Sequence, residues 1–321
     1  MSEVPAARLP VVAVVGPTAT GKSELGVALA LALGGEVVNA DAMQLYRGMD
    51  IGTAKVTAAE RCGVTHHQLD VLEVEQDASV AAYQRDARAD LAAARARGAR
   101  PVVVGGSGLY VRALMDRMEL APVDPRVRAD LEARAQTLGP GLLHDELARL
   151  DPAAAATIGR ANTRRIVRAL EVIEITGRSW TAVLPEQEYA TPAVQIGLDC
   201  AREVLDARVE ARVDRMWRRG LVEEVAGLAP RIGRTAARAV GYAQVLALLQ
   251  GDLTPQAARE STVVGTRRLA RKQMGWFGRD PRVHWLDAAD PELLDRALRL
   301  VADADAGRLV DPGAHSRRLG S

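Results

Sequence analysis

The sequence predicts an α/β fold in which a parallel sheet is flanked by helices and interrupted by a helical insertion. Over the first third of the chain, short β-branched runs alternate with helical segments, which is the rhythm of parallel strands joined by crossover helices. From about Pro122 the strand pattern gives way to helices with Pro, Gly and Asp between them, and it returns near Val194. The simplest architecture is therefore one α/β core with an insertion.

The expected elements follow from local patterns. Residues 11–15 (VVAVV) form an unbroken β-branched run, which is typical of a strand buried on both faces. A helix at 22–33 is closed by two glycines, and a helix at 79–97 has Ser79 as its N-cap. The other expected elements are strands at 36–40, 101–104, 194–199 and 283–286, a helix at 161–176 and a helical region from Arg202.

These elements divide the 321 residues into an interrupted core and an insertion. We expect the first part of the core at 1–120, the helical insertion at 121–193, a second, basic and helical part of the core at 194–306, and a disordered tail at 307–321.

Composition excludes several classes of protein. Hydrophobic residues make up 48% and charged residues 26%, which argues against disorder. No apolar stretch is long enough to span a bilayer, and the N-terminus lacks the pattern of a signal peptide. Two cysteines, Cys62 and Cys200, provide neither a disulfide framework nor a cysteine metal cluster. We therefore expect a cytoplasmic protein without a membrane anchor.

Basic residues are unevenly distributed and are almost all arginine. Only three are lysines, Lys22, Lys55 and Lys272, so each lysine marks a position where a compact ammonium was preferred. Residues 201–280 contain fifteen basic and nine acidic residues, a net charge of +6, which leaves −5 for the rest of the chain. This asymmetry is consistent with a polyanionic partner at the C-terminal third, although a solvated helical face would give the same count.

The motif GPTATGKS at 16–23 satisfies the P-loop pattern G-x-x-x-x-G-K-[ST] between a hydrophobic strand and a helix. In that context, successive backbone N–H groups and the positive end of the helix point at an anion. Lys22 would reach phosphate oxygens, and the Ser23 hydroxyl could ligate Mg²⁺. The motif predicts a P-loop NTPase-like core, but it does not identify the phosphate compound.

Two further strand ends lie at the same edge of the predicted sheet. Asp41 follows the second strand, and the turn Gly105-Gly106-Ser107-Gly108 follows the third. The guanine-specifying Asn-Lys-x-Asp motif of GTPases is absent, and the third strand ends in glycines where an ATPase usually has an aspartate. A carboxylate, a hydroxyl and a phosphate cradle would therefore face one crevice, although an isolated strand-end Asp is more often structural.

The pair His66-His67 does not predict a metal site. Adjacent residues in a strand point to opposite faces, so both cannot serve one ion, and Cys62 has poor ligand spacing to them. We expect packing or hydrogen bonding.

Together these segments resemble the tRNA dimethylallyltransferase (isopentenyl-tRNA transferase) family. The resemblance extends from Val11 to about Asp287 and is carried by GPTATGKS (16–23), NADAMQLYRGMDIGTAK (39–55), HHQLD (66–70), SVAAYQRDA (79–87), GGSGLYVRAL (105–114), DPAAAATIGRANTRRIVRALEVIEITG (151–177), RMWRRGLVEEV (215–225), AVGYAQ (239–244) and TRRLARKQMGWF (266–277). It implies transfer of a dimethylallyl group from dimethylallyl diphosphate to N6 of the adenine just 3′ of the tRNA anticodon (position 37), with release of diphosphate.

The resemblance also implies roles for individual residues. The P-loop would cradle the donor diphosphate with Mg²⁺ near Ser23, through Gly16, Pro17, Thr18, Ala19, Thr20, Gly21, Lys22 and Ser23. Asp41 matches the general base, and Ser107, also implied to be catalytic, stands where the family usually has Thr. Arg212 matches the arginine that stabilises diphosphate, with Arg208 as the alternative. Position 42, commonly Ser in the family, is Ala42 in this chain.

The same matching implies contacts with the anticodon stem-loop of tRNA. These fall at Asp41, Ala42, Met43, Gln44, Ser107, Arg128, Arg164, Arg165, Arg168, Arg238, Gly241, Tyr242, Arg271, Lys272, Gln273 and Trp276. For Trp276 and Phe277, stacking on bases and packing in the core are both open interpretations.

We expect a monomer that binds tRNA and the prenyl donor and does not bind a membrane. The alternatives are a P-loop small-molecule kinase, and a non-catalytic RNA-binding module that the intact Lys22, Ser23 and Asp41 argue against.

Overall fold

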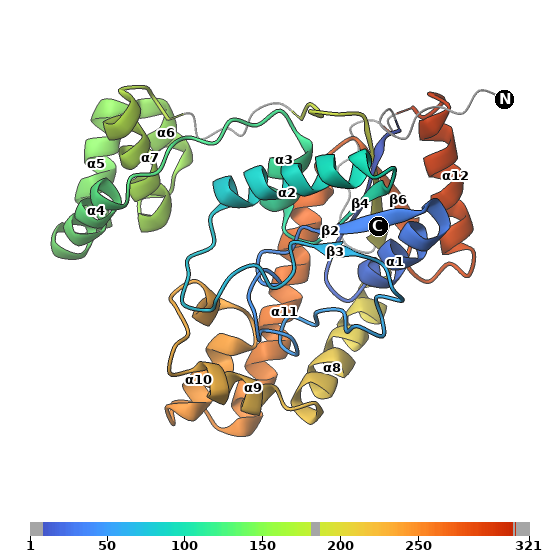
Figure 1. Ribbon diagram of the computed structural model, residues 1–321. Helices are drawn as coiled ribbons and strands as arrows, with labels where there is room; N and C mark the ends of the chain where they lie inside the picture. The colour runs from blue at the N-terminus through green and yellow to red at the C-terminus, as the bar shows by residue number, and fades with distance from the viewer. Residues whose placement is uncertain (1–8, 181–186, 311, 313–321) are drawn as a thin grey trace. The chain divides into compact units, whose positions relative to one another are not determined.

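The computed structural model describes residues 9–180, 187–310 and 312 and confirms the predicted parallel sheet with helices on both faces (Figure 1). All the strand pairs are parallel, and the strand order is β3-β2-β4-β1-β5-β6. The strands are β1 (Val11–Val15), β2 (Gly35–Asn39), β3 (His66–His67), β4 (Arg100–Val104), β5 (Ala193–Asp199) and β6 (Val283–Asp287). The strands expected from the sequence are present to within one residue at each end, and β3 is an addition.

Alternate residues of the central strands face two apolar layers. Val14 of β1 packs in a cluster with α1 (Lys22–Leu33) and α12 (Leu293–Asp305), whereas its neighbour Ala13 packs in a cluster with α2, α3 and α11. These last helices span Val80–Ala96, Gly108–Met115 and Pro255–Phe277. Because both faces are covered, β1 is apolar along its whole length and its five residues are fully buried.

The helix boundaries follow the expected capping residues. Gly34 ends α1 in the left-handed conformation. The Ser79 side chain accepts a hydrogen bond from the Ala82 N–H at the start of α2. At β3, His67 is hydrogen-bonded to Glu36, with 2.6 Å between His67 Nε2 and Glu36 Oε2. The expected structural use of this histidine is therefore confirmed.

A group of C-terminal helices packs against the segment that follows β2. It comprises α8 (Arg202–Arg218), α9 (Leu221–Leu228), the 3₁₀ turn η2 (Ala236–Arg238) and α10 (Tyr242–Leu249). An apolar cluster of α9, η2 and α10 includes Tyr46 and Met49 from that segment, both fully buried. These helices therefore help to shape the loop beyond the strand ends.

The chain divides into two compact units, one of residues 1–116 and 189–321 and the other of Arg117–Glu188. The second unit contains α4 (Pro125–Leu138), α5 (Pro140–Leu150), α6 (Pro152–Thr157) and α7 (Thr163–Thr176), packed around Leu131, Leu147 and Ile166. The insertion was expected at 121–193, but Tyr189 already belongs to the first unit, where it forms an antiparallel bridge with Asp116.

Most of the expected tail at 307–321 lies outside the described residues. In the part of the chain that the structure describes, no helix combines the length and apolar character needed to cross a bilayer.

Candidate active site

Three adjacent strands end at one edge of the sheet with the predicted functional segments. In the strand order β2, β4, β1, these ends lead into Asp41, the turn at 105–108 and the P-loop respectively. Because parallel strands run in the same direction, all three segments lie at the same edge. The predicted convergence is therefore present in the fold.

The P-loop joins β1 to the N-terminus of α1. Its N-cap, Gly21, has no side chain to cap the first-turn N–H groups, which leaves them available to an anion. Lys22 Nζ donates to the Pro17 carbonyl at 2.6 Å, and Thr20 Oγ1 donates to the same oxygen at 2.9 Å. The lysine ammonium therefore folds back across the loop from the first position of the helix.

Asp41 is held in a turn directly after β2. Its Oδ1 accepts a hydrogen bond from the Met43 N–H at 2.9 Å, and its own N–H donates to Asn39 Oδ1 at 3.1 Å. Asn39 is buried, and its side-chain amide also donates to the carbonyls of Asp41 and Gln68. Asn39 therefore fixes the backbone that presents the carboxylate, a positioning role that the sequence analysis missed.

Ser107 links the glycine turn to this segment. Its Oγ accepts a hydrogen bond from the Ala42 N–H at 3.1 Å, and its backbone N–H donates to the Ala40 carbonyl at 3.3 Å. Position 42 therefore contributes its backbone N–H to a hydrogen bond with Ser107. The hydroxyl and the Asp41 turn are consequently held next to each other.

The charges of Lys22, Arg212 and Asp41 act on one another. The pKa of Lys22 is lowered to about 7 because burial and the Arg212 cation disfavour its charge, while Asp41 partly offsets them. Burial likewise lowers the pKa of Arg212, and Asp41 again opposes the change. The carboxylate is therefore close enough to influence both cations, as an acid beside the anion cradle should be.

Arg212 of α8 faces the loop after β2, where its Nη2 lies 3.5 Å from the Thr53 carbonyl. Arg208, one turn earlier, instead exerts its charge on the Cys200 thiol. Arg212 and Arg208 were the two candidates for the arginine that stabilises diphosphate. Of these, Arg212 is the one whose charge interacts with Lys22 and Asp41.

Glu224 and Lys55 hold the loop between Asp41 and Thr53 in place, and neither was among the predicted site residues. The Glu224 carboxylate accepts the backbone N–H groups of residues 50, 51 and 52 at 2.7–3.1 Å and also the hydroxyl of Tyr242. Lys55 is buried and donates to the Tyr46 carbonyl and to two aspartates, Asp50 and Asp70. Because the sequence has only three lysines, Lys55 could have been singled out as a position with a specific role. No feature of the sequence distinguishes Glu224 from the other glutamates.

The predicted tRNA-contacting residues of the first unit fall into two groups. Arg238, Arg271 and Lys272 are exposed. Tyr242 is fully buried, because its ring packs in the α9–α10 cluster and its hydroxyl binds Glu224, so its side chain does not meet the expectation of a tRNA contact. Gly241 is also buried.

Other predicted contacts of this unit lie among protein groups. Met43 and Gln44 are partly buried, and the Gln44 side chain donates to the Thr53 carbonyl. Gln273 is buried against the P-loop. Of the two aromatic residues, Phe277 lies in the core and Trp276 is partly buried against it. Core packing is therefore the correct interpretation for Phe277.

In the second unit the predicted arginines also differ. Arg164 and Arg165 are exposed near the start of α7. Arg128 and Arg168 instead form ion pairs with Glu171, which is fully buried, at 2.5 and 2.7 Å. A buried carboxylate needs such partners, so these two arginines stabilise the bundle in this structure.

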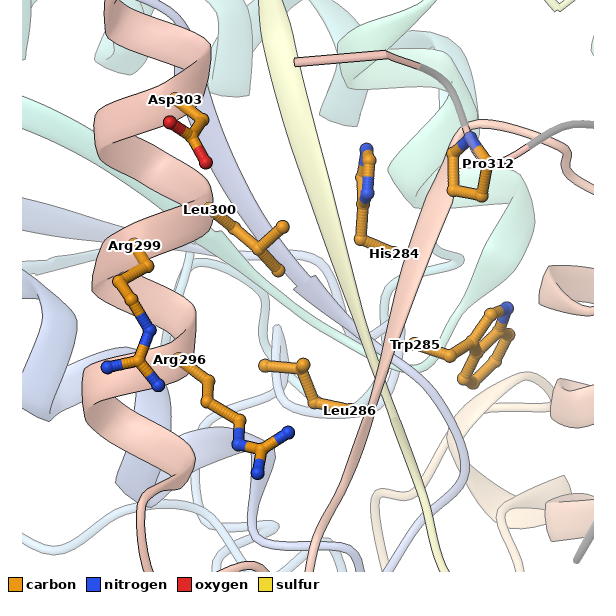
Figure 2. A pocket seen from close by; sticks show the side chains of 8 residues that line it. All are labelled: His284, Trp285, Leu286, Arg296, Arg299, Leu300, Asp303 and Pro312. Carbon is orange, nitrogen blue, oxygen red and sulfur yellow. The ribbon is translucent and has the colours of Figure 1, made fainter. Parts of the chain in front are cut away.

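A surface hollow of about 500 Å³ between β6 and α12 is shown in Figure 2. None of its lining residues belongs to the P-loop, the Asp41 turn or the glycine turn. Its charged side chains on α12 already have partners, in the pairs Arg296–Asp290, Arg299–Glu292 and Asp303–Arg308. The hollow therefore offers no convergent charge for a ligand.

The sequence is similar to known proteins over most of its length. A family model described as IPP transferase matches residues 44–280. The tRNA dimethylallyltransferase of Kineococcus radiotolerans is 59% identical over 311 residues, which cover 93% of this chain and 98% of that protein. The tRNA dimethylallyltransferase of Thermobifida fusca is 58% identical and covers 91% of this chain and 94% of its own length.

Solved structures agree. The full-length tRNA isopentenylpyrophosphate transferase of Bacillus halodurans superposes with a TM-score of 0.68 at 38% identity, over 94% of this chain and 97% of that one. A eukaryotic dimethylallyltransferase acting on tRNA shares the fold, with a TM-score of 0.81 at 24% identity over 94% of this chain and 81% of that one. These matches support the transferase interpretation and not the kinase alternative. Because the similarity extends over more than nine-tenths of the sequence and not over the P-loop alone, the chain belongs to the IPP transferase family.

Proposed function

We propose that the protein transfers a dimethylallyl group from dimethylallyl diphosphate to N6 of the adenine 3′-adjacent to the anticodon of tRNA, position 37. The curated relatives are tRNA dimethylallyltransferases at 58–59% identity. The observation that carries the proposal is that the P-loop, the Asp41 turn and the Ser107 turn lie at one edge of the sheet, where the charge of Asp41 acts on Lys22 and Arg212. A base and an anion cradle in one crevice are what this reaction requires.

The Asp41 carboxylate would act as the general base. The bond between the prenyl C1 and the diphosphate oxygen breaks, the bond between C1 and adenine N6 forms, and the N6 proton passes to the carboxylate. An exocyclic adenine amine is a poor nucleophile because its lone pair is delocalised into the ring. A positioned base typically accelerates such a step ~10²–10⁴-fold.

The P-loop and two cations would stabilise the leaving diphosphate. Its charge increases as the C–O bond breaks, and the first-turn N–H groups of α1, Lys22 and Arg212 would meet that charge. The lowered pKa of Lys22 does not oppose this role, because a bound anion favours the ammonium form. Ser107 would keep the Asp41 turn in register through its hydrogen bond to the Ala42 N–H.

Mg²⁺ fits this donor set through Ser23. The Ser23 side chain is partly exposed at the second residue of α1 and offers an oxygen ligand. Among the described residues there is no group of three His, Cys, Asp or Glu side chains that could hold an ion without substrate. Mg²⁺ characteristically takes few protein ligands and completes its shell with phosphate oxygens and water. When bound, the ion would neutralise charge on the diphosphate.

Recognition of tRNA would require the target adenine to leave the stacked anticodon loop. Enzymes that act on a base extrude it into a pocket, and cationic side chains hold the flanking backbone. The exposed Arg271 and Lys272 on α11, and Arg164 and Arg165 in the second unit, are candidates for phosphate contacts.

We propose that the protein acts in the cytoplasm as a monomer.

Mass analysis of anticodon-loop nucleosides tests the proposal. The protein is incubated with tRNA, Mg²⁺ and dimethylallyl diphosphate, and we expect position 37 to gain one C₅H₈ unit with release of diphosphate. The same incubation without the prenyl donor but with ATP is the control. Unmodified nucleosides in the first reaction, or ADP formation in the second, would contradict the proposed function.

A further inference from the structure

Gln273 on α11 contacts the P-loop from the other end of the sequence. Its side chain is 7% exposed, and its Oε1 accepts a hydrogen bond from the Thr18 N–H at 2.8 Å. The Thr18 N–H is thus directed toward α11. One amide side chain therefore fixes the backbone of the P-loop two residues after its first glycine.

The same amide group lies against the glycine turn. A Cβ placed on Gly106 would come within 2.3 Å of Gln273 Nε2, closer than real Cβ contacts come. Three residues along α11, Trp276 covers Gly108, where an added Cβ would lie 2.1 Å from the indole Cδ1. Residues three apart share a helix face. This face of α11 therefore contacts both the P-loop and the turn that carries Ser107.

The neighbouring residues Arg271 and Lys272 point elsewhere, since both are exposed. Their charges are available to a polyanion, whereas the buried amide of Gln273 is in contact with the segments that hold the donor. The resemblance to relatives suggested a tRNA contact for Gln273, but its hydrogen bond indicates a different partner.

We propose that Gln273 is a positioning residue for the prenyl donor. By holding the Thr18 N–H and packing against Gly106, it keeps the P-loop in register with the Ser107 turn, so that the remaining P-loop N–H groups and Lys22 meet the diphosphate. The inference rests on the proposed function, because it takes the diphosphate to be bound at the P-loop.

The substitution Gln273→Met tests this role. Methionine is unbranched and similar in length, so it preserves packing while removing the acceptor. The matched control is Gln256→Met, because Gln256 is on the same helix but exposed, with its amide donating to Glu260. Calorimetry with dimethylallyl diphosphate and a gel-shift assay with tRNA measure the two affinities separately.

We expect the affinity of Gln273→Met for the donor to fall about tenfold, because the P-loop N–H groups and Lys22 are no longer held in register to meet the diphosphate. Its affinity for tRNA should match that of the Gln256→Met control, and its melting temperature should be only slightly lower, because the Thr18 N–H alone loses its acceptor. Loss of tRNA affinity with unchanged donor affinity would overturn the proposal and return Gln273 to tRNA binding. Failure of the unaltered protein to bind the donor would instead contradict the proposed function itself.

Two further variants keep the test decisive if Gln273→Met folds poorly. Gln273→Glu retains an oxygen acceptor for the Thr18 N–H, so hydrogen exchange of the P-loop peptide should stay as slow as in the unaltered protein. Gly106→Ala should displace the Gln273 amide and weaken donor binding without changing tRNA binding. Rapid exchange in the first variant, or unchanged donor affinity in the second, would refute the proposal.

Discussion

Raising the pH from about 6 to about 8 should weaken binding of dimethylallyl diphosphate about tenfold through Lys22 alone. In the free protein the pKa of Lys22 is about 7, because burial and Arg212 disfavour its charge. The diphosphate needs the ammonium form, so the dissociation constant rises in inverse proportion to the fraction of charged lysine, that is, as the neutral fraction grows. For a pKa near 7 that fraction increases from about a tenth to about nine-tenths over this interval.

The sign of the effect distinguishes it from simple destabilisation of the fold. A lysine whose folded pKa lies below its ordinary 10.5 binds fewer protons in the folded protein than in the unfolded one between about pH 7 and pH 10.5. Through Lys22 the free energy of unfolding therefore rises with pH in this window, whereas donor affinity falls. Weaker donor binding in a protein that is no less stable is the combination expected.

Isothermal titration calorimetry in buffers of different ionisation enthalpy provides the assay. Near pH 8, binding should take up close to one proton per site, because the bound anion restores the charge of Lys22. The control is Lys22→Arg, since a guanidinium stays charged throughout this range. The control also corrects for titration of the ligand. Equal proton uptake and equal pH slopes in the two proteins would refute the assignment to Lys22.

Three other variants test separate parts of the site. Asp41→Ala should slow transfer ~10²–10⁴-fold and leave tRNA affinity largely intact, since the base acts in the transition state. Near-normal single-turnover transfer would exclude its role. Replacing both Arg271 and Lys272 by alanine should weaken tRNA binding and flatten its salt dependence by about two counterions, measured as the slope of log affinity against log salt; an unchanged slope would mean that they do not contact phosphate. Glu224→Ala should lower the free energy of unfolding by about 2 kcal/mol in urea titrations, because three loop N–H groups and the Tyr242 hydroxyl lose their acceptor. Its control is the exposed neighbour Glu223, whose replacement by alanine should change stability little, and equal effects of the two substitutions would contradict the role given to Glu224.

Local features of the sequence were sufficient to predict five of the six strands found in the described residues and the edge of the sheet at which the P-loop, Asp41 and Ser107 lie. The five residues of β1 are each apolar because both faces of the strand are covered, and this continuous run can be recognised without a structure. The P-loop follows from its motif between a strand and a helix. Asp41 could be placed with it because parallel strands end at the same edge, a rule that needs no knowledge of side-chain contacts.

Motif matching was less informative about individual side chains. Arg128 and Arg168 matched tRNA-contacting positions of the family, yet both pair with Glu171, which is fully buried. Tyr242 matched a tRNA-contacting segment but is buried against α9. Helical spacing shows which residues share a face, whereas the group opposite that face comes from another element.

The amino-acid sequence by itself determined the succession of strands and helices along the chain, the P-loop turn and the position of Asp41 after the second strand, since each depends on neighbours in the chain. Tertiary structure alone decided how those parts are held. The Gln273 side chain binds the Thr18 N–H across 255 residues, and Glu224 binds the backbone of residues 50–52 from more than 170 residues away. Such hydrogen bonds satisfy backbone groups that no local side chain reaches, so they exist only once the sheet and its covering helices have assembled.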